Sequence, residues 1–257
     1  IFQEPMTALN PLYTVGNQIG EVLELHEAMR PNAARARAIE LLARTGIPEP
    51  EKRIDVYPHQ LSGGQRQRAM IAMALACRPR LLICDEPTTA LDVTIQAQIL
   101  ALLDELQAEM GMALLFITHD LNLVRRFTHH VGEMERGRLV EVGATATVFG
   151  APQHSYTKKL LASRPQRVVQ PVPADAPLLV QGENVGVSFS FSEGWFGKRQ
   201  FQAVKGATLS LKRGETLGIV GESGSGKTTL GMALLALQPI STGAIHLDGE
   251  RIDNADR

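Results

Sequence analysis

Cysteine is almost absent from this 257-residue sequence, which has only Cys77 and Cys84, both in apolar surroundings. Two cysteines exclude a disulfide framework and a four-cysteine metal site. A membrane helix needs about 18 apolar residues, and no uncharged apolar run in the sequence is that long. No signal-peptide pattern opens the chain. The formal net charge of -1 argues against a generally basic nucleic-acid binder. We therefore expect a soluble protein of a reducing compartment. Because the first residue is Ile1 rather than Met, we also expect a longer natural chain.

The first two thirds of the sequence alternate between helical and strand patterns. Residues 16–45 carry apolar side chains at helical spacing with a break at Pro31, and a largely apolar helix runs to Ala76. Two short apolar runs, 81–84 and 113–118, predict buried parallel strands, and an amphipathic helix lies between them. This alternation predicts a doubly wound α/β core.

The composition changes after this core. Residues 164–177 are rich in proline and lack periodic hydrophobic residues, so they predict an extended linker. Residues 178–192 and 201–211 then predict short strands, and 216–220 predicts a further strand that leads into a glycine-rich turn. A new structural unit is therefore expected from residue 178.

The glycine-rich turn matches the phosphate-binding pattern G-x-x-x-x-G-K-[ST], between a predicted strand and a helix expected to open at Thr229. Its residues are Gly221, Glu222, Ser223, Gly224, Ser225, Gly226, Lys227 and Thr228. Glycines let successive backbone N–H groups turn toward a phosphate, and the helix N-terminus adds positive potential. Lys227 is expected on the β- and γ-phosphates, and the Thr228 hydroxyl on Mg²⁺. The alternative is a plain strand-to-helix turn with a chance lysine.

Three polar residues follow the two predicted parallel strands. Asp85 and Glu86 end the first strand, at the sheet edge where α/β folds bind ligands. Asp85 suits a Mg²⁺ contact through water, and Glu86 suits a general base that polarises the attacking water. His119 follows the second strand and could donate to a γ-phosphate. The alternatives are a solvated strand end for the carboxylates and a structural role for the histidine.

A second anion-binding nest is predicted where a helix begins at Ser62, Gly63, Gly64 and Gln65. The serine hydroxyl and the glycine N–H groups can contact phosphate oxygens. The alternative is a plain capped helix with Ser62 as the cap.

These motifs together resemble those of an ABC-transporter nucleotide-binding domain. LSGGQ at 61–65 resembles the signature, LLICDEP at 81–87 the Walker B, ALD at 90–92 the D-loop and ITHD at 117–120 the H-loop. FQEP at 2–5 resembles the Q-loop and 221–228 the Walker A.

The resemblance implies a fold, a ligand set and further site residues. The fold is an α/β P-loop NTPase of the ABC type, with a helical signature subdomain and an antiparallel β subdomain. The ligands are ATP and Mg²⁺. The resemblance adds Gln3 to the catalytic and metal-binding residues and Asp92 to the nucleotide-binding residues. It also implies an aromatic that stacks on adenine, with Phe189 as the first choice and Phe191 as the second. For Phe189, a core strand aromatic is the alternative.

Longer stretches narrow the resemblance to the oligopeptide/dipeptide importer branch, including fused double-ATPase members similar to the microcin C/peptide and glutathione importers. These stretches are QEPMTALNP, EPTTALDVTIQAQIL, GESGSGKTTLG and APQHSYTKKLLASRP. The resemblance implies an ATPase that energises import of peptides or peptide-like solutes, peripheral on the cytoplasmic face of the inner membrane. Its implied partners are membrane permease subunits, a substrate-binding protein indirectly, and a second ABC domain in head-to-tail pairing, with no nucleic acid.

The order of the motifs departs from a single domain of this family, because the Walker A comes last. The order is explained if the chain is an excerpt from a fused protein with two ABC domains in tandem. Residues 1–163 are then the back of a first ABC domain, 164–177 a linker and 178–257 the front of a second domain. In that case Lys227 and Ser62 serve one composite site and Glu86 serves the opposite one, so the chain alone is expected to hydrolyse ATP poorly. A circularly permuted single domain is the alternative.

Two other functions fit parts of the pattern. A soluble ABC-type ATPase acting on nucleic acid or the ribosome predicts long coiled coils or a basic linker, and the sequence has neither. A non-hydrolysing nucleotide-binding module would not need Glu86 and His119. The transported solute is not encoded in these motifs.

Overall fold

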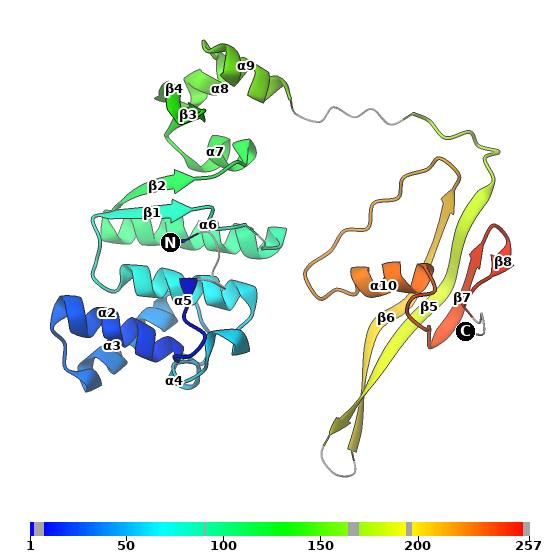
Figure 1. The fold of residues 1–257 in the computed structure, drawn as a ribbon, viewed down its shortest axis with the longest axis horizontal. Helices are drawn as coiled ribbons and strands as arrows, with labels where there is room; N and C mark the ends of the chain where they lie inside the picture. The colour runs from blue at the N-terminus through cyan, green and yellow to red at the C-terminus, as the bar shows by residue number, and fades with distance from the viewer. Residues whose placement is uncertain (3–7, 90, 164–169, 194–196, 254–257) are drawn as a thin grey trace. The chain divides into compact units, whose positions relative to one another are not determined.

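The computed structural model describes residues 1–2, 8–89, 91–163, 170–193 and 197–253 (Figure 1). The chain divides into two compact units, residues 1–165 and 166–257. None of the described helices is both long enough and apolar enough to cross a membrane.

Unit 1 begins with helices and continues with short strands. Its helical elements are α2 (Val15–Glu27), α3 (Pro31–Arg44), α4 (Pro50–Arg53), the 3₁₀ helix η1 (Pro58–Gln60), α5 (Gly63–Leu75), α6 (Val93–Met110), α7 (Leu121–Phe127), α8 (Thr145–Gly150) and α9 (Ser155–Ala162). Its strands are β1 (Leu81–Asp85), β2 (Ala113–Ile117), β3 (His130–Glu135) and β4 (Arg138–Ala144). The expected helices at 16–45 and up to Ala76, and the expected strands near 81–84 and 113–118, are confirmed.

The helices of unit 1 begin and end where the sequence provides caps. Thr14 accepts a hydrogen bond from Asn17 N at the start of α2, and Pro31 occupies the first turn of α3. Proline is tolerated there because the first N–H groups of a helix have no intrahelical partner. The break at Pro31 therefore starts a new helix.

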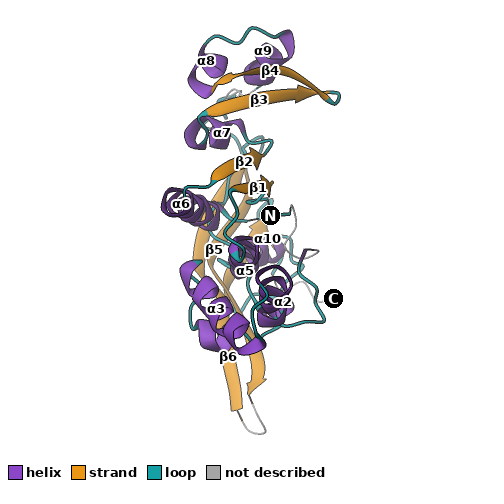
Figure 2. Cartoon of the chain, turned by 90° about the vertical axis from the view of Figure 1, so that its left-hand side faces the viewer, coloured by secondary structure: helices purple, strands orange, loops and turns teal. Residues whose placement is uncertain are grey.

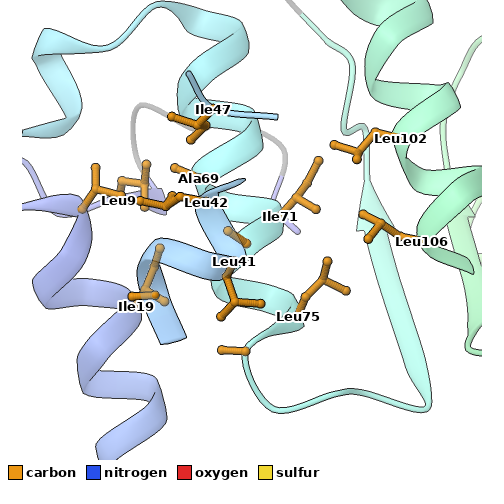
Figure 3. Packing of buried hydrophobic residues seen from close by; sticks show 14 of the residues in the cluster. Leu9, Ile19, Leu41, Leu42, Ile47, Ala69, Ile71, Leu75, Leu102 and Leu106 are labelled. Atoms are coloured by element: carbon orange, nitrogen blue, oxygen red, sulfur yellow. The ribbon is translucent and has the colours of Figure 1, made fainter. Parts of the chain in front are cut away.

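One hydrophobic cluster joins α2, α3, α5, α6 and β1. Figure 3 shows Leu41 and Leu42 of α3 near Ile71 of α5, with Leu102 and Leu106 facing them from α6. Leu42 and Ile71 are fully buried. The start of α5 and the end of β1 are therefore held by the same hydrophobic core.

Strands β1 and β2 are parallel, with Leu81 opposite Ala113 and Asp85 opposite Ile117. The expectation that both strands are buried on both faces is wrong. Alternate residues are exposed, for example Ile83 at 47% and Leu115 at 50%. Side chains alternate between the two faces of a sheet. Within the described residues, the face that carries Leu82 and Cys84 packs against the hydrophobic cluster that also includes α6.

Strands β3 and β4 form an antiparallel hairpin, and α7 and α8 flank it (Figure 2). Val124, Val131 and Val148 form a small cluster beneath the hairpin. The Glu141 carboxylate is linked to the backbone just before α9, because one oxygen accepts a hydrogen bond from the N–H of Gln153 and the other from the N–H of His154. These contacts fix the N-terminus of α9 against the hairpin.

In its described residues, unit 2 is an antiparallel sheet with one helix. Its elements are β5 (Leu178–Glu193), β6 (Gly197–Lys212), α10 (Lys227–Leu234), β7 (Thr242–Leu247) and β8 (Glu250–Arg251), with strand order β6-β5-β7-β8. Helix α10 packs on β5 and β6 around a core of Val185, Val187, Val204, Leu230 and Ile245. The strands expected near 178–192 and 201–211 are confirmed.

The strand expected at 216–220 is not formed in the structure. Its apolar residues are exposed instead, with Leu217 at 45% and Val220 at 92%. A strand is stable only when its backbone N–H and C=O groups pair with a neighbour. Within the described residues no strand pairs with this segment. Helix α10 also begins at Lys227, two residues before the expected Thr229.

Candidate functional site

The carboxyl edge of the β1–β2 sheet brings Glu86 and His119 together. Their side chains follow two neighbouring parallel strands, whose carboxyl ends lie at one edge. The His119 Nδ1 atom lies 2.9 Å from Glu86 Oε1. The backbone N–H of Glu86 donates to Ile117 O at 2.9 Å, which ties the first strand end to the second. The two residues predicted from separate strands therefore meet in one place.

The electrostatics of this pair follow from its geometry. The hydrogen bond to Glu86, and then the charge of that carboxylate, raise the pKa of His119 above its ordinary value. The His119 side chain is 76% exposed and that of Glu86 is 20% exposed. The imidazole therefore reaches toward solvent while it is held by a partly buried carboxylate, an arrangement that can present a second ring nitrogen to a phosphate.

Asp85 lies at the end of β1 and is partly buried. Its backbone N–H donates to Ile1 O at 3.0 Å. The predicted Gln3 lies outside the described residues. Within the part of the chain that is described, no cluster of three His, Cys, Asp or Glu side chains has the placement of a metal site.

The predicted nest at the start of α5 is a capped helix. Ser62 Oγ accepts from Gln65 N at 3.3 Å, and Gln65 Oε1 accepts from Ser62 N at 3.2 Å, which forms a capping box. Gly64 has a packing role as well, because a Cβ there would lie 2.8 Å from Ile95 Cγ2. Gly63 and Gly64 thus provide the first N–H groups of α5 close to α6. The capping hydrogen bonds do not test whether this turn binds an anion, so that part stays a prediction.

Asp92 is the N-cap of α6, where its Oδ1 accepts from Ile95 N at 2.9 Å. This bond gives the residue a structural role beside its predicted nucleotide role. Phe189 lies opposite Phe201 in the β5–β6 ladder and packs, partly buried, against the core of unit 2. Both interpretations of Phe189, as a core aromatic and as an adenine contact, fit this half-buried position.

The predicted phosphate loop lies directly before α10. Gly221, Gly224 and Gly226 have φ of 157°, 79° and 91°, the last two in the left-handed region that glycine adopts readily. Lys227 Nζ donates to Gly221 O at 2.7 Å and to Glu222 O at 2.6 Å. The loop thus curls around the ammonium group at the helix N-terminus. Its other residues, Glu222, Ser223, Ser225, Thr228 and Thr229, follow the same turn into α10.

Sequence reasoning missed one residue of the carboxyl edge. Thr89 Oγ1 donates to Glu86 Oε2 at 2.8 Å. The usable signal was a hydroxyl residue three positions after Glu86, beyond a proline that starts a turn.

Comparison with known proteins supplies the family context. The sequence profile of the family described as ABC transporter matches residues 1–89 and 204–257. The chain is 54% identical over 256 residues to the Peptidoglycan transport ATP-binding protein YejF of Agrobacterium fabrum, covering 99% of this chain and 47% of the relative. It is 48% identical over 280 residues to the Glutathione import ATP-binding protein GsiA of Pectobacterium atrosepticum, covering 98% and 45%. The chain spans about half the length of the curated relatives it matches.

A solved structure with a similar fold is cbiO1 from Clostridium perfringens, described as part of the ABC transporter complex cbiONQ. It aligns with a TM-score of 0.51 and 33% identity, covering 59% of this chain and 58% of cbiO1. This likeness shows that the aligned part of the chain shares the fold of this ABC transporter component.

Proposed function

The chain belongs to the ABC transporter family, and we propose that its natural protein hydrolyses ATP to energise import of peptides or peptide-like solutes. The observation that carries the proposal is the Glu86–His119 contact at the sheet edge, in a chain that also carries the phosphate loop before α10. The names of the relatives, one a peptidoglycan transport and one a glutathione import ATP-binding protein, support the solute class.

The proposed arrangement is a tandem of two ATP-binding domains. Residues 1–163 form the back of the first domain, 164–177 the linker and 178–257 the front of the second. The support is the motif order together with an alignment of 256 residues to a relative of about twice this length. In this arrangement Lys227 and Ser62 act at one composite site, and Glu86 acts with Asp85, Gln3 and His119 at the other.

ATP and Mg²⁺ are the proposed ligands. The N–H groups of the phosphate loop and Lys227 would hold the phosphates, because a helix N-terminus with inward N–H groups favours an anion. Hydroxyl and carboxylate oxygens are the donors that Mg²⁺ prefers. Thr228 would hold the ion at one site, and Asp85 with Gln3 at the other. The ion when bound would neutralise phosphate charge.

The chemistry falls to the side chains at the carboxyl edge of β1 and β2. Glu86 accepts a proton from the attacking water as general base, and the contact with His119 orients its carboxylate. The exposed His119 ring donates to the γ-phosphate. The proposed partners are membrane permease subunits, a substrate-binding protein through them, and the second ABC domain. The proposed location is peripheral, on the cytoplasmic face of the inner membrane.

The test is ATP hydrolysis by the natural protein at its full length, with and without membranes that contain its permease. We expect permease membranes to stimulate turnover. Lys227→Ala should lower stimulated turnover by about twofold or more, because it removes charged hydrogen bonds to phosphate at one of the two proposed sites. Lys205→Ala, which removes an exposed lysine of β6, is the matched control and should keep turnover.

Three results would contradict the proposal. Stimulation by ribosomes or nucleic acid, and not by permease membranes, would favour a soluble ABC-type ATPase. ATP binding without hydrolysis under every condition would favour a regulatory module. Wild-type turnover in Lys227→Ala would remove the phosphate loop from the mechanism.

A further inference from the structure

The Glu86 carboxylate has a hydrogen-bond partner on each of its oxygens. His119 Nδ1 lies 2.9 Å from Oε1, and Thr89 Oγ1 donates to Oε2 at 2.8 Å. The terminal torsion of a glutamate side chain has broad minima, so one hydrogen bond leaves the carboxylate plane free to rotate. Two bonds on different oxygens fix that plane.

A tight turn holds the Thr89 hydroxyl in place. Glu86 has φ of 43°, in the left-handed region that few residues other than glycine adopt. The N–H of Thr89 donates to Glu86 O at 3.1 Å and closes the turn. A non-glycine residue in this conformation persists only where its surroundings determine it, and such residues gather at active sites.

The middle of the turn is anchored in the protein. Pro87 and Thr88 are buried, and Thr88 Oγ1 accepts from Gln96 Nε2 of α6 at 3.3 Å. The turn is therefore attached to the helix that forms part of the core of unit 1. Because the backbone that leads into Thr89 is held, its hydroxyl reaches Glu86 without a separate ordering step.

We propose that Thr89 is a positioning residue for ATP hydrolysis, whose hydroxyl holds the Glu86 carboxylate in the plane that accepts a proton from the attacking water. This inference rests on the proposed function, in which Glu86 is the general base. In this role Thr89 acts through the Glu86 carboxylate. Its effect falls on the hydrolysis step and not on ATP binding.

The experiment measures single-turnover hydrolysis of radiolabelled ATP by the full-length natural protein, together with the ATP dissociation constant. Thr89→Val removes the hydroxyl at nearly constant size. We expect it to slow the hydrolytic phase that depends on Glu86 by about 5- to 10-fold, with the dissociation constant changed by less than about twofold. Thr89→Ser keeps a hydroxyl and should restore the rate to within about twofold of wild type.

Thr94→Val is the matched control, because Thr94 is an exposed threonine at the start of α6. It should leave both the rate and the dissociation constant unchanged. If Thr89→Val fails to fold, Thr89→Ala deletes the same hydroxyl and takes its place. A rate for Thr89→Val within twofold of wild type would overturn the inference. So would failure of Thr89→Ser to restore the rate.

Glu86→Gln separates this inference from the proposed function. If Glu86→Gln removes the hydrolytic phase and Thr89→Val leaves it unchanged, the positioning role is wrong and the general base stands. If Glu86→Gln hydrolyses ATP at the wild-type rate, the general-base assignment itself is wrong. With both correct, adding Thr89→Val to Glu86→Gln causes no further loss.

Discussion

Two glycines of the proposed phosphate loop, Gly224 and Gly226, are expected to respond very differently to substitution by alanine. Both have positive φ, 79° and 91°. A Cβ at Gly224 would meet no atom within 4 Å, so Gly224→Ala bears only the left-handed backbone cost of about 1–2 kcal/mol. A Cβ at Gly226 would lie 2.3 Å from Ala203 O, a backbone atom of β6, well inside the contact distance of about 3.5 Å. The loop or the strand must then move.

The measurement is the affinity of each variant for a fluorescent ATP analogue, since the loop must keep this shape to hold phosphate. A cost of 1–2 kcal/mol predicts about 5- to 30-fold weaker binding for Gly224→Ala. Gly226→Ala should weaken binding by more than about 100-fold. Thermal unfolding of both variants checks that unit 2 stays folded. The reasoning would be refuted if the two variants bound the analogue within threefold of each other, or if Gly224→Ala were the weaker binder.

Three further predictions concern unit 1. Leu42→Ala should lower the free energy of unfolding by about 2–5 kcal/mol in urea denaturation, because Leu42 is fully buried, whereas Leu25→Ala, at an exposed position, should stay within about 0.5 kcal/mol. Gln18→Leu should cost about 1–3 kcal/mol in the same assay, because the buried Gln18 amide bonds to the backbone of the loop before α2. Glu86→Gln should lower the pKa of His119 in an NMR titration, because Glu86 raises it. The stabilisation from a protonated His119 is complete below its unfolded pKa and is lost as pH rises through the raised pKa. An unchanged His119 titration would contradict this coupling.

The sequence predicted those parts of the fold whose signals are local. Pro31 breaks one helical pattern and begins the next, because a proline fits only the first turn of a helix. The apolar run at 81–84 and the run at 113–118 each formed a strand, and the two pair in parallel. Glu86 and His119 could be expected at one edge because each follows one of these strands.

The remaining features depend on contacts that no local pattern contains. The segment 216–220 has the composition of a strand, but its strand state requires a neighbour that accepts its hydrogen bonds. The exposure of Ile83 depends in the same way on what covers the second face of the sheet. Thr89 was missed because its proposed role requires the left-handed turn at Glu86, which a glutamate followed by proline does not reveal.

The most direct test of the account counts the ATP molecules that each variant of the full-length natural protein binds and hydrolyses in a single turnover. The account predicts that Glu86→Gln binds two ATP per molecule and leaves one of them intact. It also predicts that Lys227→Ala binds one ATP fewer than wild type, because Lys227 and Glu86 serve different sites. Hydrolysis of both ATP molecules by Glu86→Gln, or full binding by Lys227→Ala, would contradict it.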